Sequence, residues 1–272
     1  MKRFYSFFGI LILSSFALFI FGCTRIDQKQ EPKPAAAPAQ QIAQEISGGP
    51  CPALLLTQAQ FVRKQDATGQ TRSVPGAAKL TILRETPAGF KSVVLEDPES
   101  NVFHKAIAYD LDPQAPGLEI LTIGATRALL KSWRFADGKW DSKTLFEGKY
   151  GGKYDRLRDM EIGDVDGDGK DEAVIATHDQ GVIEVIELDD PSYPHQEICR
   201  SADTFIHEIE LGDIDGDGVK EIFATFSLPN KASGVSQSGY VAMARFKNGK
   251  YEVEKIDEIE KSHAKEILAT PM

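Results

Sequence analysis

Two almost identical acidic loops constrain the fold of this chain more than any other feature. Residues 163–169 read Gly-Asp-Val-Asp-Gly-Asp-Gly, and residues 212–218 read Gly-Asp-Ile-Asp-Gly-Asp-Gly. The two loops lie 49 residues apart, and a less complete copy begins at Asp110, 54 residues before Asp164. A period of about 50 residues is typical of chains that repeat one small sheet, as in propellers and solenoids.

Short apolar runs after each loop predict strands. A glutamate and a β-rich run follow the loops at residues 119–123, 172–177 and 221–226. Two further strands are expected in each unit. They lie at residues 129–135 and 140–146 in the first unit, at 182–188 and 197–200 in the second, and at 240–246 and 251–256 in the third. The dipeptides Asp137-Gly138 and Asn248-Gly249 favour tight hairpin turns between the last two strands of a unit. The pattern predicts an all-β fold, a β-propeller built from four-stranded repeats.

The two ends of the repeat region set the expected number of blades. Residues 53–61, 79–84 and 90–96 match strands two, three and four of a unit, and residues 263–269 match a first strand. Pairing of the last segment beside the first one would close a ring of four blades and protect its sheet edges. The alternative is an open fragment of a larger propeller.

The acidic loops have the donor spacing of a cation site. Their carboxylates fall at positions 1, 3, 5 and 9, position 7 offers a backbone carbonyl, and such oxygen donors select Ca²⁺ over Zn²⁺ or a redox metal. Two Ca²⁺ sites are expected, formed by Asp164, Asp166, Asp168, Lys170 and Glu172, and by Asp213, Asp215, Asp217, Val219 and Glu221.

Neither loop fits an EF-hand. Position 12 is Ile175 or Ala224 where an EF-hand needs a glutamate, and the flanking segments predict strands instead of helices. The copy that begins at Asp110 has Gln114 at position 5 and shifts Glu119 to position 10. We expect that copy to bind a cation weakly or not at all.

The loops resemble the FG-GAP or VCBS-type repeats of integrin α-subunit propellers and of many exported bacterial proteins. The hallmark of that family is an Asp-x-Asp-x-Asp-Gly-x-x-Asp/Glu loop between the first and second strands of a blade. The resemblance covers roughly residues 53–272 and implies a calcium-stabilised β-propeller, expected as a domain over residues 51–272. Members commonly serve in adhesion or ligand binding, and some are enzyme scaffolds, so the resemblance names no ligand.

The N-terminal region has the pattern of an export signal. Lys2 and Arg3 precede the uncharged residues 4–21, and the sequence Ile-Phe-Gly-Cys at residues 20–23 resembles a bacterial lipobox. This resemblance implies a signal peptide over residues 1–22 and acyl chains on Cys23; an uncleaved membrane anchor is the alternative.

The residues after the signal suggest a destination and a tether. In the lipoprotein pattern, Thr24 after the cysteine favours the outer membrane or cell surface over the inner membrane. Residues 23–50 are rich in Pro, Ala and Gln and predict a disordered tether. The chain is therefore expected in the cell envelope.

Charge and motifs narrow the possible functions. The net charge of -10 argues against nucleic-acid partners and against direct binding to anionic membranes, so membrane contact is expected only through the lipid anchor. No metalloprotease, nucleophile-elbow or phosphate-binding motif supports catalysis. A basic ring could still bind an anionic ligand or supply a lyase-like base. Its members each lie six residues before position 1 of a loop or its equivalent: His104, Arg158, His207 and His263.

These features favour a calcium-binding propeller lipoprotein that binds a protein or glycan and catalyses no reaction. One alternative is a propeller-scaffold enzyme, a lyase or hydrolase acting on polysaccharide. Another is a purely structural envelope protein. A pocket of converging His and carboxylate side chains would favour the enzyme, and a broad shallow face would favour binding.

Overall fold

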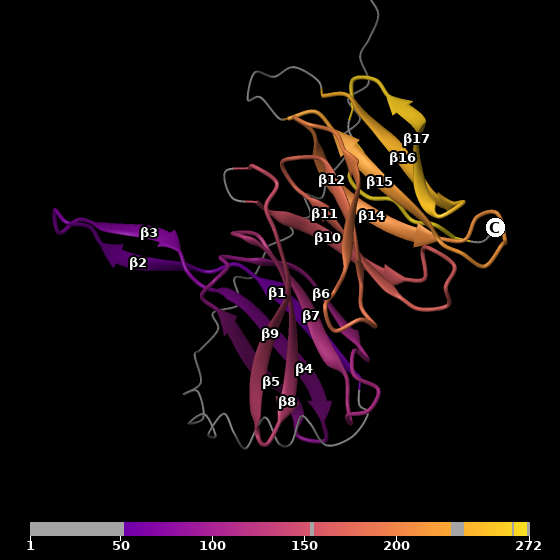
Figure 1. The fold of residues 1–272 in the computed structure, drawn as a ribbon. Helices are drawn as coiled ribbons and strands as arrows, with labels where there is room; N and C mark the ends of the chain where they lie inside the picture. Colours follow the sequence, from indigo (N-terminus) through magenta and orange to yellow (C-terminus); the bar gives the residue numbers. More distant parts are fainter. Residues whose placement is uncertain (1–51, 153–154, 230–236, 263, 271–272) are drawn as a thin grey trace, which may run out of the picture. The chain divides into compact units, whose positions relative to one another are not determined.

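The computed structural model describes residues 52–152, 155–229, 237–262 and 264–270. These residues form 17 strands in five antiparallel sheets, which confirms the predicted all-β class (Figure 1). The predicted signal peptide at residues 1–22, Cys23 and the tether at residues 23–50 lie outside the described part. No helix in the described part is long and apolar enough to cross a membrane.

Three of the sheets have four strands, and each follows chain order. Their strands lie where the sequence predicts them, with an acidic loop or its eroded copy between the first two strands of each sheet. The sheets comprise β6 (Phe103–Tyr109), β7 (Glu119–Gly124), β8 (Ala128–Ala136) and β9 (Lys139–Gly148); β10 (Leu157–Gly163), β11 (Glu172–Thr177), β12 (Val182–Glu187) and β13 (His195–Arg200); β14 (Phe205–Gly212), β15 (Glu221–Ser227), β16 (Gly239–Lys247) and β17 (Lys250–Ile259).

The two predicted hairpin turns are present. Asp137 and Gly138 have φ angles of 52° and 78°, and Asn248 and Gly249 have φ angles of 53° and 77°. Positive φ at both central residues is what a type I′ turn requires, and Asp-Gly and Asn-Gly reach it at low cost. These local signals fix the connections β8–β9 and β16–β17.

The N-terminal sheet differs from its prediction. It consists of β1 (Ala53–Gln58), β4 (Ala78–Thr86) and β5 (Gly89–Asp97), in that order. In the other three sheets, the first strands contact one another in succession: β6 contacts β10, and β10 contacts β14. β1 contacts β6 in the same way, so β1 occupies the position of a first strand. The assignment of residues 53–61 to a second strand is therefore wrong, and among the described residues this sheet has three strands.

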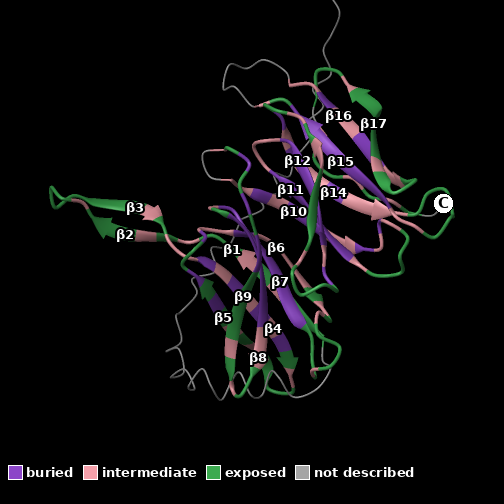
Figure 2. Cartoon of the chain, in the orientation of Figure 1, coloured by how far each residue is buried: buried purple, intermediate pink, exposed green. Residues whose placement is uncertain are grey.

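A hairpin stands where the other sheets carry their acidic loops. β2 (Phe61–Gln65) and β3 (Thr71–Pro75) pair with each other between β1 and β4. Their residues are exposed or half-buried, in contrast to the buried central strands β7, β11 and β15 (Figure 2). The hairpin is thus an addition to the sheet and contributes little to its core.

The predicted closing strand at residues 263–269 is also wrong for the described residues, since residues 264–270 contain no strand. This segment packs on β14 and the end of β15: a Cβ added to Gly212 would lie 2.4 Å from the Ala269 Cβ, and Ser227 Oγ donates to the Ala264 carbonyl at 3.4 Å. Because β1 is itself a first strand, another first strand has no place in its sheet. The seam expected for a closed four-blade ring is therefore absent from the described residues.

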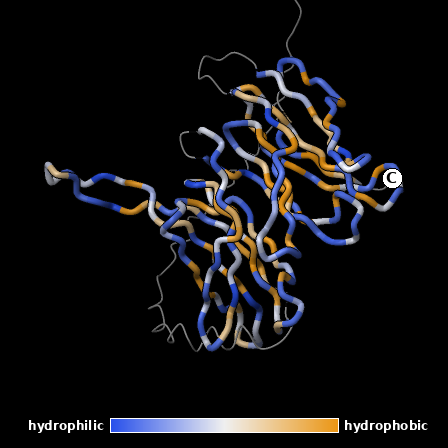
Figure 3. The backbone as a smooth tube through the Cα atoms, in the orientation of Figure 1, coloured by the Kyte–Doolittle hydropathy of each residue, from blue (hydrophilic) through white to orange (hydrophobic). Residues whose placement is uncertain are grey.

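The apolar core lies between successive sheets. One cluster joins β1, β4 and β5 to the β6–β9 sheet, a second joins that sheet to β10–β13, and a third joins β10–β13 to β14–β17. Figure 3 shows the apolar stretches that supply these clusters. Each sheet is therefore stabilised mainly by burial against its neighbours.

Buried charges also connect the sheets. The Asp159 carboxylate on β10 lies 3.0 Å from Lys105 Nζ on β6 and accepts the backbone N–H of Ile209 on β14 at 2.8 Å. Lys131 Nζ on β8 lies 2.9 Å from Asp97 Oδ2 on β5. Each link joins strands that belong to different sheets.

Candidate metal centre

The two complete acidic loops wrap around their own first aspartate. Asp164 Oδ1 accepts the backbone N–H of Gly167 at 2.7 Å, and Oδ2 accepts that of Gly169 at 3.0 Å. These glycines have φ angles of 81° and 84°, a conformation that suits residues without a Cβ. Asp213 makes the same two bonds with equal lengths to Gly216 and Gly218.

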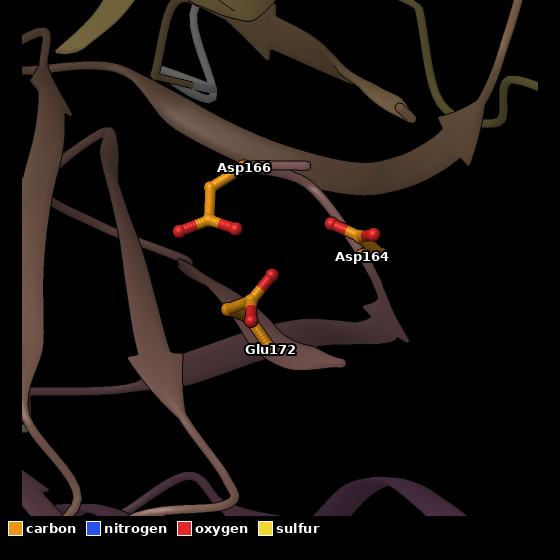
Figure 4. Close-up of side chains that lie close together, drawn as sticks. All are labelled: Asp164, Asp166 and Glu172. Carbon is orange, nitrogen blue, oxygen red and sulfur yellow. The ribbon is translucent and has the colours of Figure 1, made fainter. Parts of the chain in front are cut away.

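The turns bring three carboxylates of each loop together. Ligand atoms of Asp164, Asp166 and Glu172 lie within 4.8 Å of one another, and Figure 4 shows these side chains around a shared space. The second loop has an equivalent group of Asp213, Asp215 and Glu221.

The remaining predicted ligands lie outside these groups. The fifth-position carboxylates instead cap the loop backbone: Asp168 Oδ1 accepts the N–H of Lys170, and Asp217 Oδ1 accepts the N–H of Val219, each at 2.8 Å. Lys170 and Val219 were predicted to act through their carbonyl oxygens, whereas these bonds engage their backbone N–H groups. Three of the four predicted carboxylates in each loop are therefore assembled.

Glu172 shows that the first group fits a cation. Its side chain is 0% exposed, and Oε2 accepts the backbone N–H of Val165 at 3.0 Å. Its other oxygen, Oε1, is buried without a hydrogen-bond partner. The pKa of Glu172 is raised to about 8, mainly by burial and also by the charges of neighbouring acidic groups such as Asp166, although the hydrogen bond from Val165 lowers it. A buried carboxylate that faces two others and lacks a donor has the chemistry of a cation ligand.

The equivalent glutamates in the other two sheets have partners. Glu221 Oε2 accepts the N–H of Ile214 at 2.9 Å, and Arg245 Nε lies 3.0 Å from its Oε1. In the eroded copy, Glu119 accepts the N–H of Leu111 at 3.1 Å and pairs with Arg134. Glu172 is therefore the glutamate of the three whose second oxygen is unpaired.

The donor set limits what these groups can bind. All the clustered side-chain donors are carboxylates, which suit Ca²⁺ or Mg²⁺ and lack the His or Cys typical of Zn²⁺ and copper sites. Because Asp164 follows β10 and Glu172 begins β11, an ion held between them would tie the two strands together.

The predicted basic ring is assembled in part. His104 on β6 and Arg158 on β10 are adjacent, with 3.2 Å between His104 Nδ1 and Arg158 Nη1. His207 on β14 contacts the ring of His178 edge to face, with centroids 6.2 Å apart. His263 lies outside the described residues. His178 was not among the predicted ring residues, because only packing of the two sheets brings it, at the end of β11, next to His207 on β14.

His104 contributes no positive charge to this group at neutral pH. Burial lowers its pKa to about 4, and the charge of Arg158 acts in the same direction. Of the two adjacent residues, only Arg158 therefore carries a positive charge at neutral pH. Binding of an anion by the ring remains a prediction.

Acidification tests this placement of His104. Its pKa is lower in the folded chain than its ordinary value of 6.5, so the unfolded chain binds more protons between these pH values. The stability that neutral His104 contributes is fully present above pH 6.5 and is lost as the pH falls through 4, by about 3 kcal/mol at most. Urea denaturation at several pH values should show a smaller acid loss for His104→Gln than for the wild type. Parallel pH profiles would contradict the assignment.

A second cluster was not predicted. Tyr150 Oη donates to Glu184 Oε2 at 2.6 Å, and His195 Nδ1 lies 2.5 Å from Glu184 Oε1. The group lies in a surface depression of about 350 Å³ that also includes Phe146 and Glu197. The available signal was a single charge, Glu184, inside the apolar run of β12.

Comparisons with known proteins add no family to these observations. A scan of protein-family models finds no match to the chain, and a search of curated proteins finds none either. The resemblance to FG-GAP or VCBS repeats therefore remains a prediction from the loops themselves.

Proposed function

We propose that this chain is an exported, lipid-anchored envelope protein whose sheets are Ca²⁺-stabilised propeller blades, and that it binds a protein or glycan without catalysing a reaction. One observation carries the metal-binding role: Glu172 Oε1 is buried without a partner beside Asp164 and Asp166. Ca²⁺ would satisfy this oxygen and neutralise the repulsion among the three carboxylates.

The order of the sheets supports the propeller interpretation. Each four-stranded sheet follows chain order, and the first strands β1, β6, β10 and β14 contact one another in sequence. The absence of a ladder between β1 and residues 264–270 favours an open arrangement over a closed ring of four blades.

An apolar hollow on the N-terminal sheet supports a binding role. It has a volume of about 580 Å³ and is lined in part by Leu54, Leu83 and Phe90. Leu54 is 60% exposed and Phe90 is 66% exposed, which is costly unless another molecule covers them. A purely structural envelope protein has no need of such a surface.

Calorimetry tests the metal-binding part. Titration of chelator-treated protein with CaCl₂ should release or absorb heat in a saturable step, and Mg²⁺ should bind more weakly because it demands smaller, near-octahedral geometry. Asp164→Ala should remove the step assigned to its loop. A wild-type titration without saturable binding would refute the calcium site.

Ligand capture tests the binding part. Immobilised full-length protein should retain a protein or glycan from an envelope extract, and Leu54→Glu together with Phe90→Glu should reduce its retention. Val253→Glu together with Ile256→Glu on β17 is the matched control, because it places the same two charges at other exposed apolar positions. Equal retention by all variants would exclude the hollow as the binding surface.

The Glu184 cluster favours one alternative, a polysaccharide lyase or hydrolase. A histidine and a tyrosine on one buried carboxylate can serve acid–base chemistry. The test is release of new sugar ends from a panel of acidic and neutral polysaccharides, with His195→Gln as the inactivating variant. Turnover that depends on His195 would replace the non-catalytic proposal.

A further inference from the structure

One cross-strand position sets the charge balance at each acidic loop. In the β11–β12 pair, Glu172 stands opposite Glu187. In the β7–β8 pair, Ile120 stands opposite Trp133, so the adjoining Glu119 and Arg134 are cross-strand neighbours. The β15–β16 register likewise makes Arg245 the neighbour of Glu221.

The two arginines occupy the space between the loop carboxylates. Arg245 Nε lies 3.0 Å from Glu221 Oε1 and 3.8 Å from Asp215 Oδ2. Arg134 repeats this arrangement, pairing with Glu119 and placing Nη1 3.9 Å from Asp112 Oδ2. In both sheets, a guanidinium therefore bridges the glutamate and the third-position aspartate. It supplies an internal positive charge where a bound ion would otherwise lie.

The middle sheet has the opposite charge at this position. Glu187 adds a carboxylate to this group. Its pKa is raised mainly by burial and next by the negative charges of Asp166 and Asp168. The nearby Lys170 directs Nζ to Asp189 at 2.5 Å and to Asp168 at 3.6 Å. Neither contact is with Glu172, whose Oε1 stays unpaired.

The two complete loops also differ in exposure. Asp164 and Asp166 are half-buried, whereas Asp213 and Asp215 are exposed. The second loop helps to cover the first, because the backbone N–H of Lys220 donates to the Asp164 carbonyl at 3.0 Å. Water therefore competes less for carboxylates in the first loop, which strengthens their attraction for a cation.

We propose that this cross-strand residue determines cation affinity and makes the two complete loops unequal. Glu187 makes the loop from Asp164 to Glu172 the high-affinity divalent site. Arg245 makes the loop from Asp213 to Glu221 a low-affinity site, and Arg134 replaces the cation in the eroded copy. This inference rests on the proposed binding of Ca²⁺ to the loops.

Reciprocal charge exchanges test the inference by calorimetric titration of the full chain with CaCl₂. The wild type should show a tight and a weak step separated by about tenfold or more. Glu187→Arg should weaken the tight step by about 100-fold, and Glu187→Gln, which only removes charge, by about tenfold. Arg245→Glu should tighten the weak step by about tenfold. Asp164→Ala identifies which step belongs to the first loop.

Two controls separate a local charge effect from a general one. Glu258→Arg makes the same charge change on an exposed residue of β17, at the end of the strand away from Arg245, and should leave both steps unchanged. Circular dichroism in EDTA should give the same β-sheet spectrum for every variant that is compared. If Glu187→Arg fails to fold, the change in affinity is measured with Glu187→Gln instead.

The outcomes distinguish this inference from the proposed function. Two steps of equal affinity, or exchanges at residues 187 and 245 that leave both steps unchanged, would overturn the affinity assignment while calcium binding stands. Absence of Ca²⁺ binding in the wild type would overturn the proposed metal role, and the inference with it. Opposite shifts in the two reciprocal variants would support the inference.

Discussion

Adding Ca²⁺ to the chelated protein is expected to raise its thermal midpoint by about 8 °C, and EDTA should reverse the increase. An ion that binds only the folded chain stabilises it by about 2.7 kcal/mol at 100 times its dissociation constant. For a chain of this size, 1 kcal/mol corresponds to about 2–4 °C. Most of the shift should come from the loop whose Glu172 is buried and unpaired.

Differential scanning calorimetry of the same preparation with EDTA and with Ca²⁺ measures this shift. Asp164→Ala should remove most of it, since the variant loses one carboxylate of the assembled group. Asp141→Ala on β9 is the matched control, because Asp141 is exposed and forms its ion pair with Lys139 on the same strand. Equal midpoints for the wild type with and without Ca²⁺ would contradict a stabilising ion.

Most of the strands were predictable because their signals are local. The apolar runs after the acidic loops and the Asp137-Gly138 turn are readable within a few residues. The β2–β3 hairpin was missed because its strands are largely polar and have no buried face to generate an apolar pattern. Its turn depends on Asp66, whose Oδ1 accepts the N–H groups of Thr68 and Gln70 at 2.9 and 3.1 Å.

The position of the N-terminal sheet was not predictable in the same way. Residues 53–61 have the composition of a strand, but composition does not distinguish a first strand from a second. That distinction depends on which neighbouring sheet the strand contacts, and β1 contacts β6. The error at residues 263–269 has the same origin, because the predicted seam required β1 to be a second strand.

The site shows the same division between local and distant information. Asp164, Asp166 and Glu172 lie within one short segment, so their spacing predicts that they meet. Glu187 and Arg245 could not be connected to the loops from spacing alone. Glu187 follows Glu172 by 15 residues, whereas Arg245 follows Glu221 by 24, because a longer connection separates β15 from β16.

Lys131→Met is expected to reduce the free energy of unfolding by about 4 kcal/mol, since loss of one partner leaves a buried charge uncompensated. Lys131 is 3% exposed and Asp97 is 2% exposed, with 2.9 Å between Nζ and Oδ2. Glu99, the other partner of Lys131, is half exposed and retains Arg127. The cost therefore falls on Asp97, whose remaining bond from the Glu99 N–H is 3.0 Å long.

Urea denaturation of Lys131→Met, Asp97→Leu and the double variant measures this cost. The double variant should recover most of the loss, because replacing both members of a buried ion pair by apolar groups leaves no unpaired charge. Lys139→Met is the control, since the exposed pair of Lys139 and Asp141 should contribute no more than about 1 kcal/mol. If Lys131→Met and Lys139→Met cost the same, the Lys131–Asp97 pair does not hold β8 against β5. A loss confined to Lys131→Met and restored by Asp97→Leu would establish that an ion pair, rather than side-chain volume, links these two sheets.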